Sequence, residues 1–267
     1  MRRGGIQPMK WSDIVSGAWI VDAPVPEIGE TPSARNPALF KSAKQMFVKA
    51  GVHILRADTT EGVKLCKDIS SSAGQVWGVV RPSAKLLSLE EISSEDLLTE
   101  VKQRVKLLVE AGPDVILLES FTDVTEAVLA IEAAKKATKL KIAVSMVFGS
   151  GADGTETIMG QSCEQVTAQL AGAGADMIGC SCGMPIDDMV LVVRLIREQT
   201  DLPIVACPDA GQRELEGPEI VYRETPEDFA SKVPSLVRVG ANVIGGCCGV
   251  TYEHLKCAVG VLTRDRG

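Results

Sequence analysis

The sequence has few aromatic residues and almost no histidine. Phe, Trp and Tyr make up 4% of the 267 residues, and there are two histidines. The hydrophobic core must therefore be built mainly from aliphatic side chains. His53 lies in an apolar run and His254 at the start of an amphipathic segment, so the pair lacks the spacing of a hydrolytic or histidine-based metal site. We expect both to have structural roles.

The sequence also lacks an excess of positive charge and lacks long apolar runs. Its 28 basic residues are outnumbered by 35 acidic ones, for a net charge of −7, which argues against nucleic acid or an anionic membrane surface as a partner. No run reaches the roughly 18 apolar residues of a membrane span. No apolar segment of signal-peptide length follows Arg2 and Arg3. We therefore expect a cytoplasmic protein that acts on a small molecule or on another protein.

Eight cysteines are present, too few for a disulfide scaffold in a chain of this size. In the cytoplasm they would stay reduced. Each free thiol then either packs in the core or binds a metal ion.

Short apolar runs alternate with longer amphipathic segments from Trp11 to the C-terminus. This alternation predicts eight parallel strands, each followed by a helix, and hence a single-domain (β/α)8 barrel over residues 1–267 with residues 1–15 as a short N-terminal extension. The predicted strands are 18–22, 52–57, 75–80, 115–119, 141–147, 176–180, 204–207 and 243–246. The predicted helices are 34–50, 61–71, 94–111, 124–137, 162–173, 187–198, 226–239 and 252–262. Active sites of such barrels lie at the carboxyl ends of the strands.

Cysteines gather at two of these strand ends. Cys247 and Cys248 follow the eighth strand between glycines, and Cys182 follows the sixth. Side chains alternate along an extended strand, so adjacent thiols can share a target only on the bent backbone that glycine permits. Three thiolates suit zinc and leave its fourth position open, as in a catalytic site. Cys207 is a possible fourth ligand that would close the site, and plain core packing is the alternative for all four.

These residues resemble the homocysteine S-methyltransferase family over most of the chain. The motifs that carry the resemblance are Gly245 to Gly249 with Glu253-His254-Leu255, Ile178 to Cys182, Pro208 to Gly211, and Asp114 to Ser120. The resemblance implies a (β/α)8 barrel in which Cys182, Cys247 and Cys248 hold zinc and the homocysteine sulfur takes the open position. It also implies that Glu119 binds the amino group of the substrate, although a rim carboxylate can instead have a structural role.

Several positions depart from the family pattern. Ser16-Gly17-Ala18 resembles an opening Asp-Gly-Ala motif with serine in place of the acid, Asp58 stands where asparagine is usual, and Asp209 also replaces an asparagine. The resemblance implies that the substrate contacts Glu119, Ser16, Gly17, Ala18, Asp58, Ser145 and Asp209. The predicted loops are short, so we expect an accessible rim.

The function implied is transfer of a methyl group to zinc-bound homocysteine, giving methionine. No Gly-x-Gly-x-x-Gly segment joins a strand to a helix, so the methyl group must come from outside. A methyl-corrinoid carrier protein, with methylcobalamin supplied in trans, is the preferred donor, and a betaine or methylsulfonium compound is the alternative. Other readings are a different thiol acceptor or a non-catalytic zinc-binding subunit. A Schiff-base aldolase is disfavoured because Lys141 opens a strand.

Overall fold

The computed structural model describes residues 9–23, 36–70, 74–85 and 87–264. Eight parallel strands form the barrel wall in the order β1-β10-β7-β6-β5-β4-β3-β2. The strands are β1 (Trp19–Ile20), β2 (Ile54–Ala57), β3 (Gln75–Val80), β4 (Val115–Phe121), β5 (Lys141–Met146), β6 (Met177–Ser181), β7 (Ile204–Cys207) and β10 (Val243–Ile244). A parallel bridge between Val21 and Ile54 brings the two end strands together. The predicted (β/α)8 barrel is confirmed.

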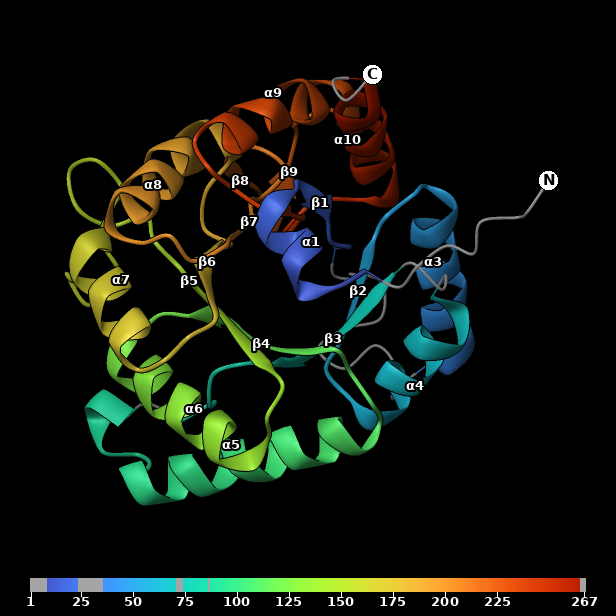
Figure 1. The fold of residues 1–267 in the computed structure, drawn as a ribbon. Coiled ribbons are helices and arrows are strands. Elements are labelled where there is room, and N and C mark those ends of the chain that lie inside the picture. Colours follow the sequence, from blue (N-terminus) through green and yellow to red (C-terminus); the bar gives the residue numbers. More distant parts are fainter. Residues whose placement is uncertain (1–8, 24–35, 71–73, 86, 265–267) are drawn as a thin grey trace.

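Within the described residues, eight α-helices surround this wall (Figure 1). They are α3 (Pro37–Lys49), α4 (Thr60–Ile69), α5 (Ser94–Glu110), α6 (Val124–Ala137), α7 (Cys163–Gly172), α8 (Ile186–Gln199), α9 (Pro226–Arg238) and α10 (Tyr252–Arg264). Most begin at a capping side chain, such as Thr59, Ser93 or Asp123, that accepts a backbone N–H of the first turn. Residues 34, 35 and 71, at the ends of two predicted helices, lie outside the described residues.

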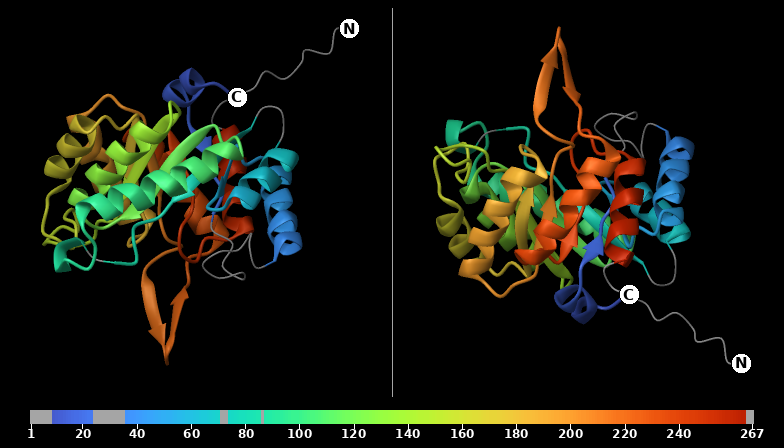
Figure 2. Two further views of the ribbon diagram at one scale, coloured as in Figure 1. Left: turned by 90° about the horizontal axis from the view of Figure 1, so that it is seen from below. Right: turned by 90° about the horizontal axis from the view of Figure 1, so that it is seen from above.

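Among the described residues, the unpredicted elements are a 3-10 helix η2 (Leu87–Leu89), a further α-helix and a β-hairpin. Helix α1 (Trp11–Ser16) lies within the expected N-terminal extension, and an antiparallel hairpin of β8 (Arg213–Glu216) and β9 (Glu219–Tyr222) separates β7 from α9. Figure 2 shows α1 and the hairpin at opposite ends of the barrel. Because the hairpin follows a strand and α1 precedes one, the hairpin marks the carboxyl-terminal end, where barrel chemistry belongs.

The core has an inner and an outer part. Inside the barrel, residues from alternate strand positions, such as Trp77 and Met177, pack together with Ile14 of α1. A larger aliphatic layer lies between the strands and the helices. Gly179 allows β6 and β7 to approach, since a Cβ there would lie 1.7 Å from the Val205 carbonyl oxygen. In the described part of the chain, no helix combines the length and the apolar character of a membrane span.

Candidate metal centre and its charged neighbours

The three predicted cysteines meet at the carboxyl-terminal end of the barrel. One ligand atom each from Cys182, Cys247, Cys248 and Asp209 lies within 4.8 Å of all the others. The Cys182 and Cys248 sulfurs are 3.6 Å apart. Tetrahedral zinc with bonds of about 2.3 Å places its sulfur ligands about 3.8 Å apart. The cluster is therefore consistent with a zinc site.

Unusual backbone geometry directs these side chains. Cys182 has a φ of +65°, and Ser120 at the end of β4 has a φ of +62°. Non-glycine residues adopt this left-handed conformation at a cost, and such strain concentrates at functional sites. Backbone bonds from Cys182 N to the Cys207 carbonyl (3.0 Å) and from Cys247 N to the Pro208 carbonyl (2.8 Å) tie both cysteine loops to the end of β7.

Asp209 joins the two loops that carry the cysteines. Its Oδ2 accepts the Gly183 N–H and its Oδ1 accepts the Cys248 N–H, each at 3.0 Å. Burial and the nearby Cys248 sulfur raise the pKa of Asp209 to about 7. Asp209 was predicted to contact the substrate, and the structure brings it to the cysteine cluster, where it can position the loops or act as an oxygen ligand.

The thiols of the cluster share their protons unequally. Hydrogen bonds from Cys182 and Cys247 lower the pKa of Cys248, while bonds to its two neighbours raise the pKa of Cys247. The phenol of Tyr222, on the hairpin, also interacts with Cys248 and helps to lower its pKa. Tyr222 packs so closely on the cysteine loop that a Cβ at Gly249 would lie 2.5 Å from it. The pKa of Cys182 is raised to about 12, so negative charge in the cluster is concentrated on the Cys248 sulfur.

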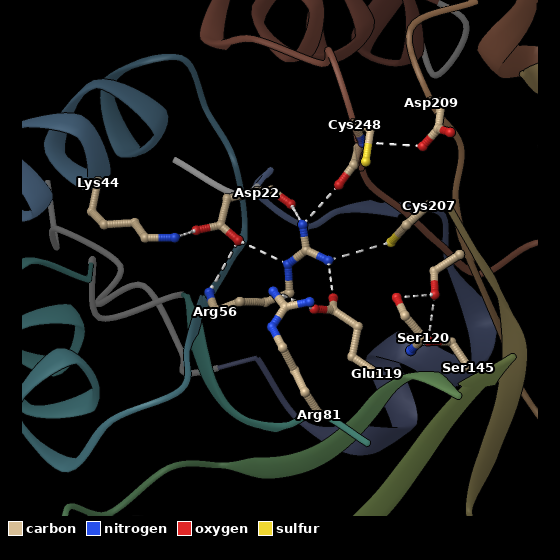
Figure 3. A network of polar contacts seen from close by, with 12 residues as sticks. Asp22, Lys44, Arg56, Arg81, Glu119, Ser120, Ser145, Cys207, Asp209 and Cys248 are labelled. Carbon is tan, nitrogen blue, oxygen red and sulfur yellow. Dashed lines mark hydrogen bonds and ion pairs between the residues drawn. The ribbon is translucent and has the colours of Figure 1, made fainter. Parts of the chain in front are cut away.

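The possibility that Cys207 is a fourth ligand is wrong. Cys207 belongs to the interior of the barrel and lies 3.7 Å from Nη1 of Arg56. Figure 3 shows its sulfur directed toward the Arg56 guanidinium, and it is not among the ligand atoms that gather in the cluster. The fourth member of the cluster is Asp209, two residues further along the chain.

A buried network of charges lies beside the cluster (Figure 3). Arg56, on β2, donates Nε and its backbone N–H to Oδ1 of Asp22, Nη1 to Glu119, and Nη2 to the carbonyl oxygens of Asp22 and Gly246. Lys44, on α3, donates to the other oxygen of Asp22. All of these charged side chains are at most 6% exposed. Gly246 precedes Cys247, so the network is joined directly to a cysteine loop.

Glu119 is paired on both oxygens. Oε1 accepts Nη1 of Arg56, and Oε2 lies 3.1 Å from Nη2 of Arg81, which follows β3. Burial alone would raise the pKa of Glu119, but the two arginines outweigh it and hold the pKa below its usual value. Glu119 is at the rim as predicted, although arginines hold the carboxylate that was expected to bind an amino group.

The other predicted substrate residues divide between the two ends of the barrel. Ser145, on β5, is buried at the cluster end, where its hydroxyl contacts that of Ser181 at 2.8 Å and accepts the Ser120 N–H at 3.1 Å. Asp58 follows β2 at the same end, and burial raises its pKa against the attraction of Arg81.

Ser16, Gly17 and Ala18 lie at the amino-terminal end of the barrel, opposite the cysteine cluster. They precede β1 and line a hollow of about 690 Å³ with residues such as Asn242, which precedes β10. The acid at the carboxyl end of β1 is Asp22, which accepts bonds from Arg56 and Lys44. The expectation that these three residues touch the substrate is therefore corrected, because side chains before a strand cannot reach the rim beyond it.

Sequence reasoning missed Asp22, Lys44, Arg56, Arg81 and Tyr222. Two signals were available: Arg56 interrupts an apolar run in a strand that the barrel buries on both faces, and Asp22 ends the first strand. A charge in such a strand needs a partner at the same depth.

Comparisons with known proteins agree with this picture. A family model described as "Homocysteine S-methyltransferase" matches residues 32–260. Homocysteine S-methyltransferases 3 and 2 of Zea mays are each 31% identical over 162 residues, which is 58% of this chain and 46% of theirs. The aligned region thus spans about half the length of these relatives.

Solved structures share the fold. The homocysteine methyltransferase MmuM of Escherichia coli matches in its apo form with a TM-score of 0.74 and 18% identity, over 91% of this chain and 95% of that one. The metallated form gives 0.73 and 19%, over 91% and 96%. A carboxyl transferase domain of Rhizobium etli pyruvate carboxylase gives 0.60 and 11%, over 91% of this chain and 43% of that one. At these identities the likeness is one of fold.

Proposed function

Because the chain belongs to the homocysteine S-methyltransferase family, we propose that it is a zinc-dependent enzyme that moves a methyl group from an external donor to the thiol of homocysteine, giving methionine. The observation that carries the proposal is the meeting of three cysteine sulfurs with Asp209 at the carboxyl-terminal end of the barrel. Cys182, Cys247 and Cys248 would hold the ion. When bound, zinc would strip the proton from the acceptor thiol, which has a pKa of about 8.5 when free, and keep the sulfur nucleophilic at neutral pH.

Asp209 would act as a positioning residue in this scheme. Both of its oxygens already accept backbone N–H groups, one from each cysteine loop. An orienting carboxylate of this kind fixes the ligands without occupying the fourth position, which stays open for the acceptor sulfur. Tyr222 would support Cys248 from the hairpin.

The acceptor would lie between the cysteines and the charged rim. Glu119, Asp58 and Ser145 are the predicted substrate residues at this end. During transfer the sulfur gains the methyl group and the donor leaves with the electron pair of the broken bond. The thiol proton passes to solvent, since the product is a neutral thioether.

We favour a methyl-corrinoid protein as the donor, with methylcobalamin supplied in trans. Supporting this, the hairpin extends from the rim and exposes Leu215 and Ile220, which pair across its two strands. Exposed apolar side chains of this kind suit a protein partner. A betaine or a methylsulfonium compound is the alternative donor.

Zinc content per chain tests the metal site. Wild type is expected to bind one zinc ion, and Cys247→Ala and Cys248→Ala are expected to lose it, because two thiolates hold zinc poorly. Cys257→Ala, on α10 and outside the cluster, is the matched control and should retain zinc. A gently purified wild-type protein without metal would refute the proposal.

Methionine formation tests the activity. Zinc-loaded protein is incubated with homocysteine and, in separate reactions, methylcobalamin, glycine betaine or a methylsulfonium compound. Turnover with the corrinoid is expected, and turnover only with a small donor would replace the favoured donor. Zinc binding without turnover in any reaction would indicate a non-catalytic zinc-binding subunit.

A further inference from the structure

We propose that Arg81 selects the acceptor by binding its carboxylate, and that the site does not require an α-ammonium group. The acceptor class is then a thiol that carries a carboxylate about three carbons from sulfur, of which homocysteine is only one member. The inference rests on the proposed function in one respect, namely that the methyl acceptor is a thiol held beside the cysteine cluster.

The first argument is that both oxygens of Glu119 are already paired with arginines. Its side chain is 4% exposed, and its two oxygens are each paired with a different arginine. An ammonium brought to this carboxylate would also lie beside the guanidinium groups of Arg56 and Arg81. Repulsion between like charges in a desolvated site opposes that arrangement.

The second argument is the order of the charges in the network. The ion pairs run Lys44, Asp22, Arg56, Glu119, Arg81, so a cation stands at each end. Arg81 is the end at the rim, and a substrate carboxylate would give it a second direct ion pair.

The third argument concerns which cation can reach a ligand. Lys44 and Arg56 are 3% and 6% exposed, whereas the Arg81 side chain is 44% exposed. Among the described residues, Glu119 is the ion-pair partner of the Arg81 guanidinium, and it engages only Nη2. Arginine presents five N–H donors in a planar fork that matches a carboxylate. Arg81 can therefore hold Glu119 with one nitrogen and a substrate carboxylate with the others.

Arg81 also lies on the correct side of the network. Its positive charge acts on Cys248 and on Asp58, both at the rim. Figure 3 shows the Arg81 guanidinium beside the Arg56 guanidinium and the Glu119 carboxylate. Asp58 is the other carboxyl group close enough to compete for Arg81 or to receive an ammonium. A variant at Asp58 is therefore needed in the test.

Three acceptor thiols test the roles of the carboxylate and of the amino group separately. Homocysteine has both, 4-mercaptobutanoate lacks the amino group, and 3-aminopropanethiol lacks the carboxylate. With zinc-loaded wild type, we expect kcat/KM for 4-mercaptobutanoate to lie within about tenfold of that for homocysteine, and 3-aminopropanethiol to be roughly 10- to 100-fold poorer, as the loss of one charge-assisted hydrogen bond predicts.

Arg81→Gln should lower kcat/KM for both carboxylate thiols by roughly 10- to 100-fold, mainly through KM, and should not lower it for 3-aminopropanethiol. Arg81→Lys keeps the charge and should recover part of the loss. Asp58→Asn should affect homocysteine and 4-mercaptobutanoate equally. Zinc content and melting temperature identify any variant that fails to fold.

Calorimetry provides a readout that is independent of turnover. The thioethers methionine and 4-(methylthio)butanoate should bind wild type with similar affinity and bind Arg81→Gln more weakly. A preference for homocysteine and methionine of more than about tenfold, or a loss confined to them in Asp58→Asn, would overturn the inference while leaving the proposed function intact. Failure to methylate any thiol would sink the proposed function, and the binding data would still decide the role of Arg81.

Discussion

The two ends of the barrel use the same kinds of residue in opposite ways. At the amino-terminal end, Asp114 and Asp176 each accept a strand N–H, at 2.7 Å from Val76 and 3.0 Å from Ile142, and pair with lysines that remain partly exposed. At the carboxyl-terminal end, Asp22 and Glu119 are almost fully buried with Arg56. Exposed pairs contribute little to stability, whereas buried ones cost desolvation and are held by many partners.

The amino-terminal end closes the barrel, and the carboxyl-terminal end holds the candidate metal site. Helix α1 covers the amino-terminal end and places Ile14 among the interior residues of the barrel. The other end has the cysteine cluster, the strained backbone of Ser120 and Cys182, and the partly exposed guanidinium of Arg81. We expect substitutions at the first end to change stability alone, and substitutions at the second to change stability and activity together.

The largest effect is expected for Glu119→Gln. The substitution leaves the buried guanidinium of Arg56 without its second anion, and breaking a buried pair in this way costs about 4 kcal/mol. Urea unfolding should show a lower midpoint at unchanged m-value, and methyl transfer should fall as well. Asp114→Asn, at the exposed end, is the matched control and should cost less than about 1 kcal/mol. Equal effects of the two variants would remove the distinction between the ends.

Ile14→Ala is expected to reduce stability and nothing else. Ile14 is fully buried, and truncation of a buried isoleucine costs about 3 kcal/mol through lost contacts and the cavity left behind. Zinc content and kcat/KM should match wild type below the unfolding transition. Val15→Ala changes an exposed neighbour on the same helix and should be nearly neutral. Loss of zinc in Ile14→Ala would show that the two ends are coupled.

Sequence patterns predicted the barrel well because each βα unit is local. The bounds of β3, β7 and α6 match the structure, since β-branched runs and apolar spacing at 3.6 residues are properties of short segments. The hairpin was not predicted, although Gly217-Pro218 between its two short strands is a turn signal, because it interrupts the regular alternation of strands and helices.

The site was predictable only where one segment carried the signal. Cys247 and Cys248 stand together between glycines, so the cluster was found. Asp22 and Arg56 each stand out in their own segment, but their pairing follows only from the contact between the segment after β1 and β2. Ser16 to Ala18 match a motif in their residue types alone. Their position before the strand, which decides the end of the barrel they occupy, was the stronger physical evidence.

The smallest effect is expected for Asp176→Asn, and the loss of stability should depend on pH. Burial alone would raise the pKa of Asp176, but Lys135, Lys141 and the Ile142 N–H outweigh it and lower the pKa below that of the unfolded chain. Its stabilisation is therefore present above the unfolded pKa of about 4 and is lost as pH falls through the folded value. Asp176→Asn should cost about 0.5 kcal/mol at pH 7, since the lysines are partly exposed, and the difference from wild type should shrink in acid. Urea midpoints at several pH values measure this. A difference that grows toward low pH would mean that Asp176 is held by something other than its lysines, and the amino-terminal end would then resemble the buried network.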